Sequence, residues 1–425
     1  MIIADKTSDQ LKLERTRSRE ATSYRYAMIS SEIRRDLQAP LARFRRLDIF
    51  HFYRSAPWND MKAAEFDERT IKFRLPFDLF WKLVRARPDI VQGPEPLSLL
   101  MLPYLVATLV YLWLNPRVKL VTLSLEPIPL HLKYHPAIVP LYRLILRGWF
   151  ARANVIFWFD TGSQRNLLAN GAPPAKLVEL IYGSWGVDTE EFTPEGPAVG
   201  MPTSDPLPAP APSPALAPSP ALAPSPAPAP LPALAPLPAP APVILYVGRL
   251  SHVKGVTYLI DAFKQLLDKG ITARLAIVGD GPERERLQSQ ARSLGLEERI
   301  TWFGTVKNAD LPPYMRSAQF LVLPSISTKL WVQQLSMTAW QAMACGLPVI
   351  ATRTGCMEEF TPPETGILVS ERDPAGLARA MASLLLDPTK RNEMSAAARR
   401  YAVHRFDARR NVERAEQIIL KWCER

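Results

Sequence analysis

Cysteine is scarce in this 425-residue chain, which has three, and no two of them form a C-x-x-C pair. This excludes the usual zinc-finger and iron–sulfur spacings, and we expect Cys345, Cys356 and Cys423 to be reduced thiols in a cytosolic protein. Histidine is also scarce, and only His131 and His135 have a spacing that could place two ligands on one helix. The sequence therefore predicts no metal site and no bound cofactor.

Acidic residues are in the minority, since 52 Lys and Arg outnumber 41 Asp and Glu and leave a net charge of +11. The excess favours anionic ligands or an anionic membrane surface as partners. The basic residues are spread through both halves, and no RNA-binding or zinc-finger pattern accompanies them, so nucleic acid is not an expected partner. The N-terminal stretch lacks the apolar core of a signal peptide, which points to a cytoplasmic protein.

Long hydrophobic runs are few, and the longest is PLSLLMLPYLVATLVYLWL at 96–114. It approaches the length needed to cross a bilayer, but Pro103 interrupts it, and a span would split the α/β pattern described below. A buried or interfacial helix is preferred, with a true span as the alternative. Together with the arginines of RFRRLD at 43–48, the run suggests peripheral contact with the anionic inner face of a membrane.

Proline is abundant, with 42 residues, and in the segment 197–242 it alternates with alanine. Proline at every second or third position prevents a helix, so this segment is predicted to be a solvated, disordered linker. It separates an N-terminal domain at 24–196 from a C-terminal domain at 243–405. Residues 1–23 are expected to be disordered, and residues 406–425 are expected to form an amphipathic helix.

Both domains show short apolar strands alternating with amphipathic helices. In the second domain Leu259 and Phe263 share one helical face, and Asp373 with Pro374 marks the start of a later helix. The alternation predicts two Rossmann-like α/β domains with parallel sheets, facing each other across a cleft. The predicted strands lie at 24–32, 47–54, 87–93, 118–126 and 153–159, and after the linker at 243–248, 273–281, 300–304, 318–325, 347–352 and 366–369.

Two cations follow the first strand of the second domain. Arg249 comes directly after VILYVG, and Lys254 lies five residues later, where a helix begins. A helix N-terminus favours an anion, and two cations beside it form a clamp suited to a diphosphate. A solvated pair on a loop is the alternative. A P-loop NTPase is not favoured, because GRLSHVKG lacks the G-x-x-x-x-G-K-[ST] pattern.

The motifs YVGRLSHVKGVTYLIDAF, LAIVGDGPERERL, LVLPS, AMACGLPVIAT and TGILV follow one another after the linker. In this order and spacing they resemble the second domain of the family 4 retaining glycosyltransferases, which have the GT-B fold. The resemblance implies a nucleotide-sugar donor held by the second domain, an acceptor of unknown kind on the first, and transfer without a metal. It assigns Arg249 and Lys254 to the diphosphate, with Gly248 beside them. It also implies that the C-terminal helix crosses back to the first domain.

The family's E-x₇-E signature is altered here. Glutamine stands at both positions, Gln333 and Gln341, and Leu335-Ser336 replaces the usual Phe-Gly. In the family the second glutamate binds the donor ribose, and the first lies near the donor sugar. An amide still accepts a hydrogen bond from a ribose hydroxyl, but it supports a positively charged transition state poorly. We expect an active transferase with an altered site, with a catalytically impaired, binding-only homologue as the alternative.

Three further donor-site assignments come from the resemblance alone. The stretch TGCMEEF resembles the family's G-G-x-x-E loop, which places Glu359 beside the donor, with a plain surface turn as the alternative. Backbone contacts near the base are expected at Gly304 and Thr305.

The acceptor side is less well marked. Glu126 lies where family members have a residue that faces the acceptor, although a helix cap or a buried ion pair is equally consistent with its position. The family's glycine-rich loop after the first strand is missing, so its phosphate contact is expected to be either absent or supplied by Arg34 or Arg35.

Overall fold

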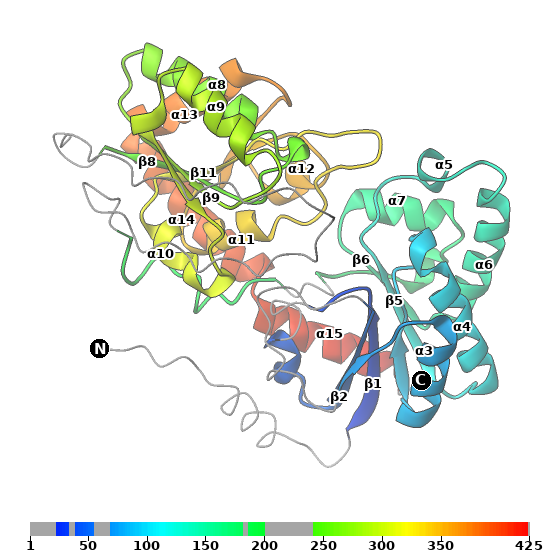
Figure 1. Cartoon of the computed structure of the whole chain (residues 1–425). Helices are drawn as coiled ribbons and strands as arrows, with labels where there is room; N and C mark the ends of the chain where they lie inside the picture. Colours follow the sequence, from blue (N-terminus) through cyan, green and yellow to red (C-terminus); the bar gives the residue numbers. More distant parts are fainter. Residues whose placement is uncertain (1–22, 34–38, 55–68, 182–185, 200–240, 424–425) are drawn as a thin grey trace, which may run out of the picture.

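The computed structural model describes residues 23–33, 39–54, 69–181, 186–199 and 241–423. Residues 1–22, Arg34, Arg35 and most of the Pro/Ala segment (200–240) lie outside this part of the chain, as do the predictions made for them. The described residues form two parallel sheets, one on each side of the linker (Figure 1). The prediction of two Rossmann-like domains is therefore confirmed.

The N-terminal domain is built on a seven-stranded sheet in the order β3-β2-β1-β4-β5-β6-β7. All of its strand pairs are parallel. The short strands at 70–72 and 177–179 were not predicted, although the equally short strand at 90–92 lies within the predicted strand at 87–93. The strands are β1 Tyr24–Ser30, β2 Leu47–Tyr53, β3 Thr70–Lys72, β4 Ile90–Gln92, β5 Lys119–Ser124, β6 Val155–Trp158 and β7 Leu177–Glu179.

Both faces of this sheet are covered, as alternation along β1 illustrates. Ala27 and Ile29 belong to a core shared with α3, α4 and α6. Tyr26 and Met28 point to the opposite face and pack with the C-terminal helix α15 (Ala408–Cys423). The helices of this domain are α3 Pro76–Ala86, α4 Leu102–Leu114, α5 Leu130–Lys133, α6 Val139–Arg152 and α7 Thr161–Ala169.

The C-terminal domain has a six-stranded parallel sheet in the order β10-β9-β8-β11-β12-β13. Its strands are β8 Val243–Val247, β9 Arg274–Val278, β10 Ile300–Gly304, β11 Phe320–Leu323, β12 Val349–Thr352 and β13 Gly366–Val369. Its helices are α8 Val256–Asp268, α9 Arg284–Ser293, α10 Pro312–Arg316, α11 Met337–Ala344, α12 Met357–Phe360, α13 Pro374–Leu386 and α14 Pro388–Arg405. The predicted cap of α13 is confirmed, because the Asp373 carboxylate accepts a hydrogen bond from the backbone N–H of Gly376 at 2.8 Å.

Two chain crossovers lie side by side between the domains. The backbone N–H of Val187 donates to the Phe406 carbonyl at 2.7 Å, and that of Ala408 donates to the Val187 carbonyl at 2.9 Å. Beyond the first crossover, Phe192 packs in the core of the second domain. Beyond the second, α15 (Ala408–Cys423) packs on the sheet of the first domain, where Val412 is fully buried. Each domain is thus completed by a segment from the other half of the chain.

The apolar run at 96–114 folds mainly as α4. Pro103 does not interrupt this helix as expected, because it lies in the first turn, where a missing N–H costs nothing. No helix among the described residues is long and apolar enough to cross a membrane.

Candidate functional site

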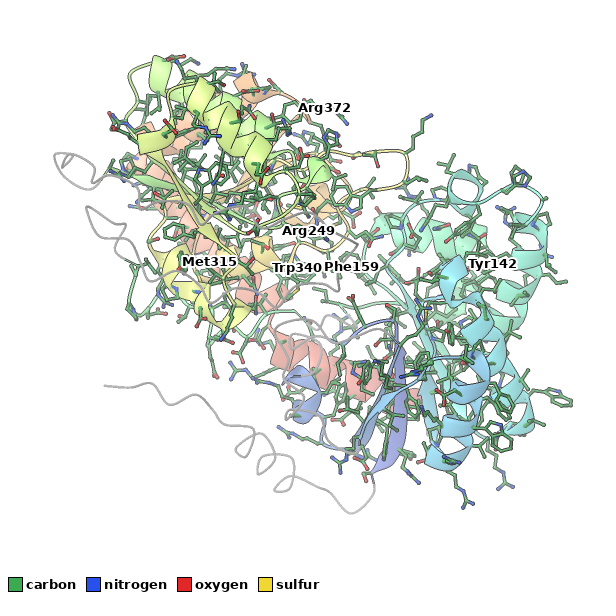
Figure 2. All side chains as sticks on the ribbon, viewed as in Figure 1. Tyr142, Phe159, Arg249, Met315, Trp340 and Arg372 are labelled. Atoms are coloured by element: carbon green, nitrogen blue, oxygen red, sulfur yellow. The ribbon has the colours of Figure 1, made fainter. Side chains whose placement is uncertain are left out.

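The carboxyl ends of the two sheets meet at the domain border. Thr161 follows β6 and Glu359 follows β12, and the backbone N–H of Thr161 donates to the Glu359 carboxylate at 3.1 Å. Two residues earlier on this side, Phe159 meets Trp340 edge-on at 6.4 Å (Figure 2) and stacks on Phe360 at 5.2 Å. Since open α/β sheets bind ligands beyond their strand ends, this border is where a site is expected.

In the second domain the strand order reverses between β8 and β11, which are neighbours in the sheet. Arg249 and Lys254 follow β8, whereas Ser325 and Gln333 follow β11. The residues that sequence analysis assigned to a diphosphate therefore lie at the topological switch point of the sheet, where such folds bind nucleotides.

Lys254 is held at the entrance of α8 by the glycine that follows it. Gly255 has a φ of 64°, and a Cβ atom there would lie 2.0 Å from the carbonyl oxygen of Pro324. Only glycine allows the loop after β8 to approach the end of β11 so closely. Burial lowers the pKa of Lys254 to about 8. Arg249, by contrast, is exposed.

The Lys254 ammonium is oriented by neutral groups. Its Nζ donates to the Oε1 of Gln333 at 2.9 Å and lies 5.0 Å from the ring centroid of Trp331. The same oxygen of Gln333 accepts a hydrogen bond from Ser325, and its Nε2 donates to the Leu335 carbonyl. No carboxylate takes part in these contacts, so Lys254 keeps its positive charge available to an anion.

The loop that carries Gln333 is locked to the loop that resembles G-G-x-x-E. The backbone N–H of Cys356 donates to the Gln333 carbonyl at 3.0 Å. A Cβ atom on Gly355, whose φ is 55°, would lie 1.9 Å from that carbonyl oxygen. The close contact between the loop of Gln333 and the loop of Cys356 therefore requires glycine at position 355. Ser336 is buried at the start of α11, and its side chain makes no cap hydrogen bond there.

Gln341 is buried in α11 and contacts a different loop. Its Nε2 donates to Oδ1 of Asn308 at 2.8 Å. Asn308 lies four residues beyond Gly304, the last residue of β10, and Thr305 between them is exposed. A glutamate could not donate this bond, so the amide has a structural role of its own.

Glu359 does not point to Lys254. It accepts hydrogen bonds from both the backbone N–H and the side-chain hydroxyl of Thr161, the first residue of α7. The carboxylate thereby caps a helix of the other domain. The neighbouring Asp160 is buried, with one oxygen unpartnered among the described atoms. Burial, followed by the charge of Glu359, raises the pKa of Asp160 to about 6.

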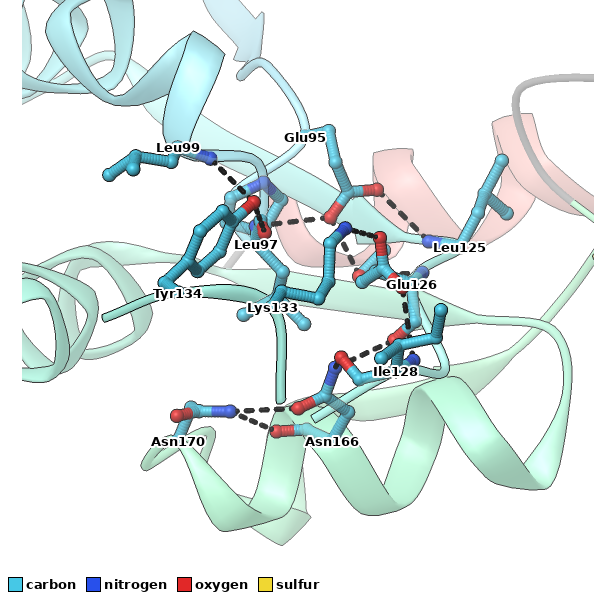
Figure 3. Close-up of polar contacts among 12 residues, drawn as sticks. Glu95, Leu97, Leu99, Leu125, Glu126, Ile128, Lys133, Tyr134, Asn166 and Asn170 are labelled. Atoms are coloured by element: carbon cyan, nitrogen blue, oxygen red, sulfur yellow. Dashed lines mark hydrogen bonds and ion pairs between the residues drawn. The ribbon is translucent and has the colours of Figure 1, made fainter. Parts of the chain in front are cut away.

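Glu126 lies at the end of β5 in the first domain and forms an ion pair with Lys133 (Figure 3). Its other oxygen accepts a hydrogen bond from the backbone N–H of Ile128. The ion pair, one of the two structural alternatives raised by the sequence, is thus present.

Glu95 is a second acid beside Glu126 that sequence analysis missed. Its carboxylate accepts hydrogen bonds from the Ser124 hydroxyl at 2.7 Å and from the backbone N–H groups of Leu125 and Leu97 (Figure 3). Burial raises its pKa to about 7, and the charge of Glu126 adds to the shift. The only sequence signal was its position in GPEP, directly after the buried strand at 90–92.

Residues 235–401 match the Glycosyl transferases group 1 family. A GDP-mannose-dependent alpha-(1-6)-phosphatidylinositol monomannoside mannosyltransferase of Mycolicibacterium smegmatis is 31% identical over 180 residues, which are 42% of this chain and 47% of the relative. A D-inositol 3-phosphate glycosyltransferase of Corynebacterium jeikeium is 34% identical over 160 residues, or 36% and 37% of the two chains. The chain spans less than half the length of each of these relatives.

Solved structures resemble the whole chain. A sucrose-phosphate synthase from Thermosynechococcus elongatus is 18% identical, with a TM-score of 0.64 over 94% of this chain and 98% of its own. Anabaena Alr3699/HepE in complex with UDP is 16% identical, with a TM-score of 0.66 over 93% of this chain and all of its own. The chain has the GT-B fold, and residues 235–401 in its second half are similar to the group 1 glycosyl transferases.

Proposed function

We propose that this protein is a retaining glycosyltransferase that moves a sugar from a nucleotide-sugar donor to an acceptor, without a metal ion or other cofactor. The observation that carries the proposal is the position of Lys254, at the entrance of α8 and at the switch point of the second sheet, with Arg249 on the same loop. The fold's likeness to Anabaena Alr3699/HepE, which was solved with UDP-glucose, supports a nucleotide-sugar donor.

In this proposal the leaving diphosphate is stabilised by two cations and a helix N-terminus. Arg249 and Lys254 supply the charge that a metal ion provides elsewhere. Gln333 is a positioning residue, because its Oε1 accepts the hydrogen bond that orients Lys254. Gln341 has its Nε2 occupied by Asn308, which leaves Oε1 to accept from a ribose hydroxyl. If the departing diphosphate takes the proton of the acceptor hydroxyl, the acceptor attacks from the face that the diphosphate leaves. The sugar then keeps its anomeric configuration.

Backbone and small side chains complete the donor site. Gly248 directly follows β8 and Gly304 is the last residue of β10; without side-chain bulk, both would permit close approach to the nucleotide. Thr305 follows β10, and Leu335 and Ser336 lie between β11 and α11, so we place all three on the donor side of the sheet. Glu359 contributes to the site indirectly, through the contact that joins the two domains.

The acceptor would lie on the first domain, at the ends of β4 and β5. Glu126 is paired with Lys133 and would orient an acceptor hydroxyl rather than deprotonate it. We propose a cytoplasmic site of action, in line with the nucleotide-sugar donor.

Calorimetry with UDP, GDP and ADP, each free and linked to a sugar, tests the donor site. Replacing Arg249 and Lys254 together with alanine is expected to weaken binding of the preferred nucleotide at least about 100-fold, since each charge-assisted contact contributes roughly 1.5–3 kcal/mol. Lys269→Ala is the matched control, because this exposed lysine lies at the far end of α8. Equal affinity in the double variant and the control would refute the proposal.

A binding protein without turnover is the second candidate, and the contacts of Gln333 favour it. Both polar atoms of that amide are occupied by the protein, and none of the contacts described for Lys254 involves a carboxylate that could support a cationic transition state. Donor hydrolysis or transfer by the parent would exclude this candidate. A large gain in rate in the Gln333→Glu, Gln341→Glu pair would mean that the amides weaken a glutamate site.

A further inference from the structure

The outward face of α4 is apolar, which is the reverse of what a surface helix requires. Its polar side chains, Tyr104, Thr108 and Tyr111, are buried. Val110 and Trp113 are exposed instead, and the Trp113 side chain is 80% exposed. The helix has no charged residue at any of its 13 positions. Its outer surface is therefore poorly suited to water.

The neighbouring helices extend this surface. On α3, Phe77 is 70% exposed and meets Trp81 edge-on at 5.9 Å. On α6, Leu141 and Leu144 are each 64% exposed. The three helices share one core beneath them and lie together on the side of the N-terminal domain away from the second domain (Figure 1). We call this surface the outer apolar face; its exposed residues are Leu75, Phe77, Trp81, Val106, Val110, Trp113, Leu114, Leu141 and Leu144.

Positive charge surrounds the outer apolar face. Residues 70–152 contain eleven Lys and Arg but four Asp and Glu. Asp78 and Glu126 each pair with a lysine, and without these two ion pairs nine cations and two acids remain, so the excess is unchanged. The exposed cations include Lys72, Arg74, Arg85, Arg87, Arg117 and Arg147.

We propose that the outer apolar face docks on an anionic lipid bilayer, with its Trp, Phe and Leu side chains in the headgroup region and the surrounding cations on lipid phosphates. Protein surfaces that bind anionic membranes typically combine exposed aromatic and aliphatic side chains with nearby Lys and Arg. A second copy of the chain fits less well, because a self-complementary dimer would bring the same cations together. The 13-residue α4 is about 20 Å long, too short to cross the roughly 30 Å bilayer core, so the contact is peripheral.

Vesicle flotation of the full chain tests this proposal without any need for glycosyl transfer. We expect the protein to float with phosphatidylcholine vesicles that contain about one-third phosphatidylglycerol, and much less with phosphatidylcholine alone. High salt should weaken the binding. The Phe77→Ser, Trp113→Ser double variant should lose at least about tenfold in partition coefficient, and Arg85→Glu with Arg117→Glu should lose a similar amount.

The control is Leu386→Ser, since Leu386 is 69% exposed on α13 of the other domain. It should float like the parent, and all variants should keep the nucleotide affinity of the parent, which separates this test from that of the donor site. Absence of flotation with anionic vesicles, or flotation that the face variants leave unchanged, would overturn the proposal. A dimer of the parent in light scattering would also overturn the proposal, if the Phe77→Ser, Trp113→Ser variant is a monomer and neither protein floats with vesicles.

Discussion

The Nζ of Lys254 and the Oε1 of Gln333 are 2.9 Å apart and share a hydrogen bond. The contact joins the loop after β8 to the loop after β11 across the switch point of the sheet. Because the partner is an amide, it orients the ammonium without neutralising it. Gln333, which replaces a glutamate of the family signature, therefore fixes the position of Lys254.

This contact predicts how Gln333→Glu changes the pH dependence of nucleotide binding. In the parent, the pKa of Lys254 is lowered to about 8, so affinity should fall as the pH rises through 8 and the ammonium loses its proton. A glutamate raises this pKa by pairing with the ammonium, so the fall should move up by roughly one pH unit or more. Calorimetry from pH 6 to 10 measures both midpoints; coincident midpoints would show that Lys254 does not control binding.

Gly255 should tolerate no side chain, whereas Gly270 should. Both have positive φ, 64° and 78°, so alanine strains the backbone by about 1 kcal/mol at either site. A Cβ at Gly255 also meets Pro324 O at 2.0 Å, while one at Gly270 meets nothing within 4 Å. We expect Gly255→Ala to lose roughly 2 kcal/mol more unfolding free energy in urea, and to lose nucleotide affinity. Equal losses would mean that this close approach is unimportant.

Glu95 should make the protein less stable as the pH rises from about 4.5 to 7. Its pKa is raised from 4.5 to about 7 in the folded state, so over this range the folded protein binds more protons than the unfolded chain. The free energy of unfolding must then fall with pH, by on the order of 2 kcal/mol from this residue. Urea titrations of the parent and Glu95→Gln across this range isolate the effect as a difference in slope.

The free energy of unfolding should fall less with pH in the Glu95→Gln variant than in the parent. At low pH the variant should be less stable than the parent, because its amide N–H₂ faces the backbone N–H of Leu125, and both groups are donors. Identical slopes would place the pH dependence elsewhere.

Glu359→Gln should lower the pKa of Asp160 from about 6, because the charge of Glu359 contributes to its elevation. Carboxyl carbon NMR titration of Asp160 measures the shift. Glu358→Gln is the control, since that carboxylate pairs with Arg353 and is absent from the groups that shift Asp160. An unchanged Asp160 titration in Glu359→Gln would show that the two domains do not hold these carboxylates together in solution.

Local patterns were enough to predict the longer strands, the cap at Asp373 and the two-domain α/β architecture. Each depends on neighbours in the chain: alternation along a strand, or a side chain that reaches a backbone N–H three residues later. The same patterns could not show that the polar residues of α4 turn inward, because a helix of apolar residues has no marked face. They also could not give Glu95 a role, since two of its partners, Ser124 and Leu125, lie about 30 residues away at the end of β5.

From the sequence alone, one could therefore derive most of the elements, their order and the residues that are expected to form the donor site. The partners of those residues were decided by folding. Lys254 and Gln333 are 79 residues apart, and Thr161 and Glu359 are 198 apart. Such pairs form only when strand order and the crossovers bring distant loops together, and a side chain's charge state and exposure depend on that arrangement rather than on its neighbours in the chain.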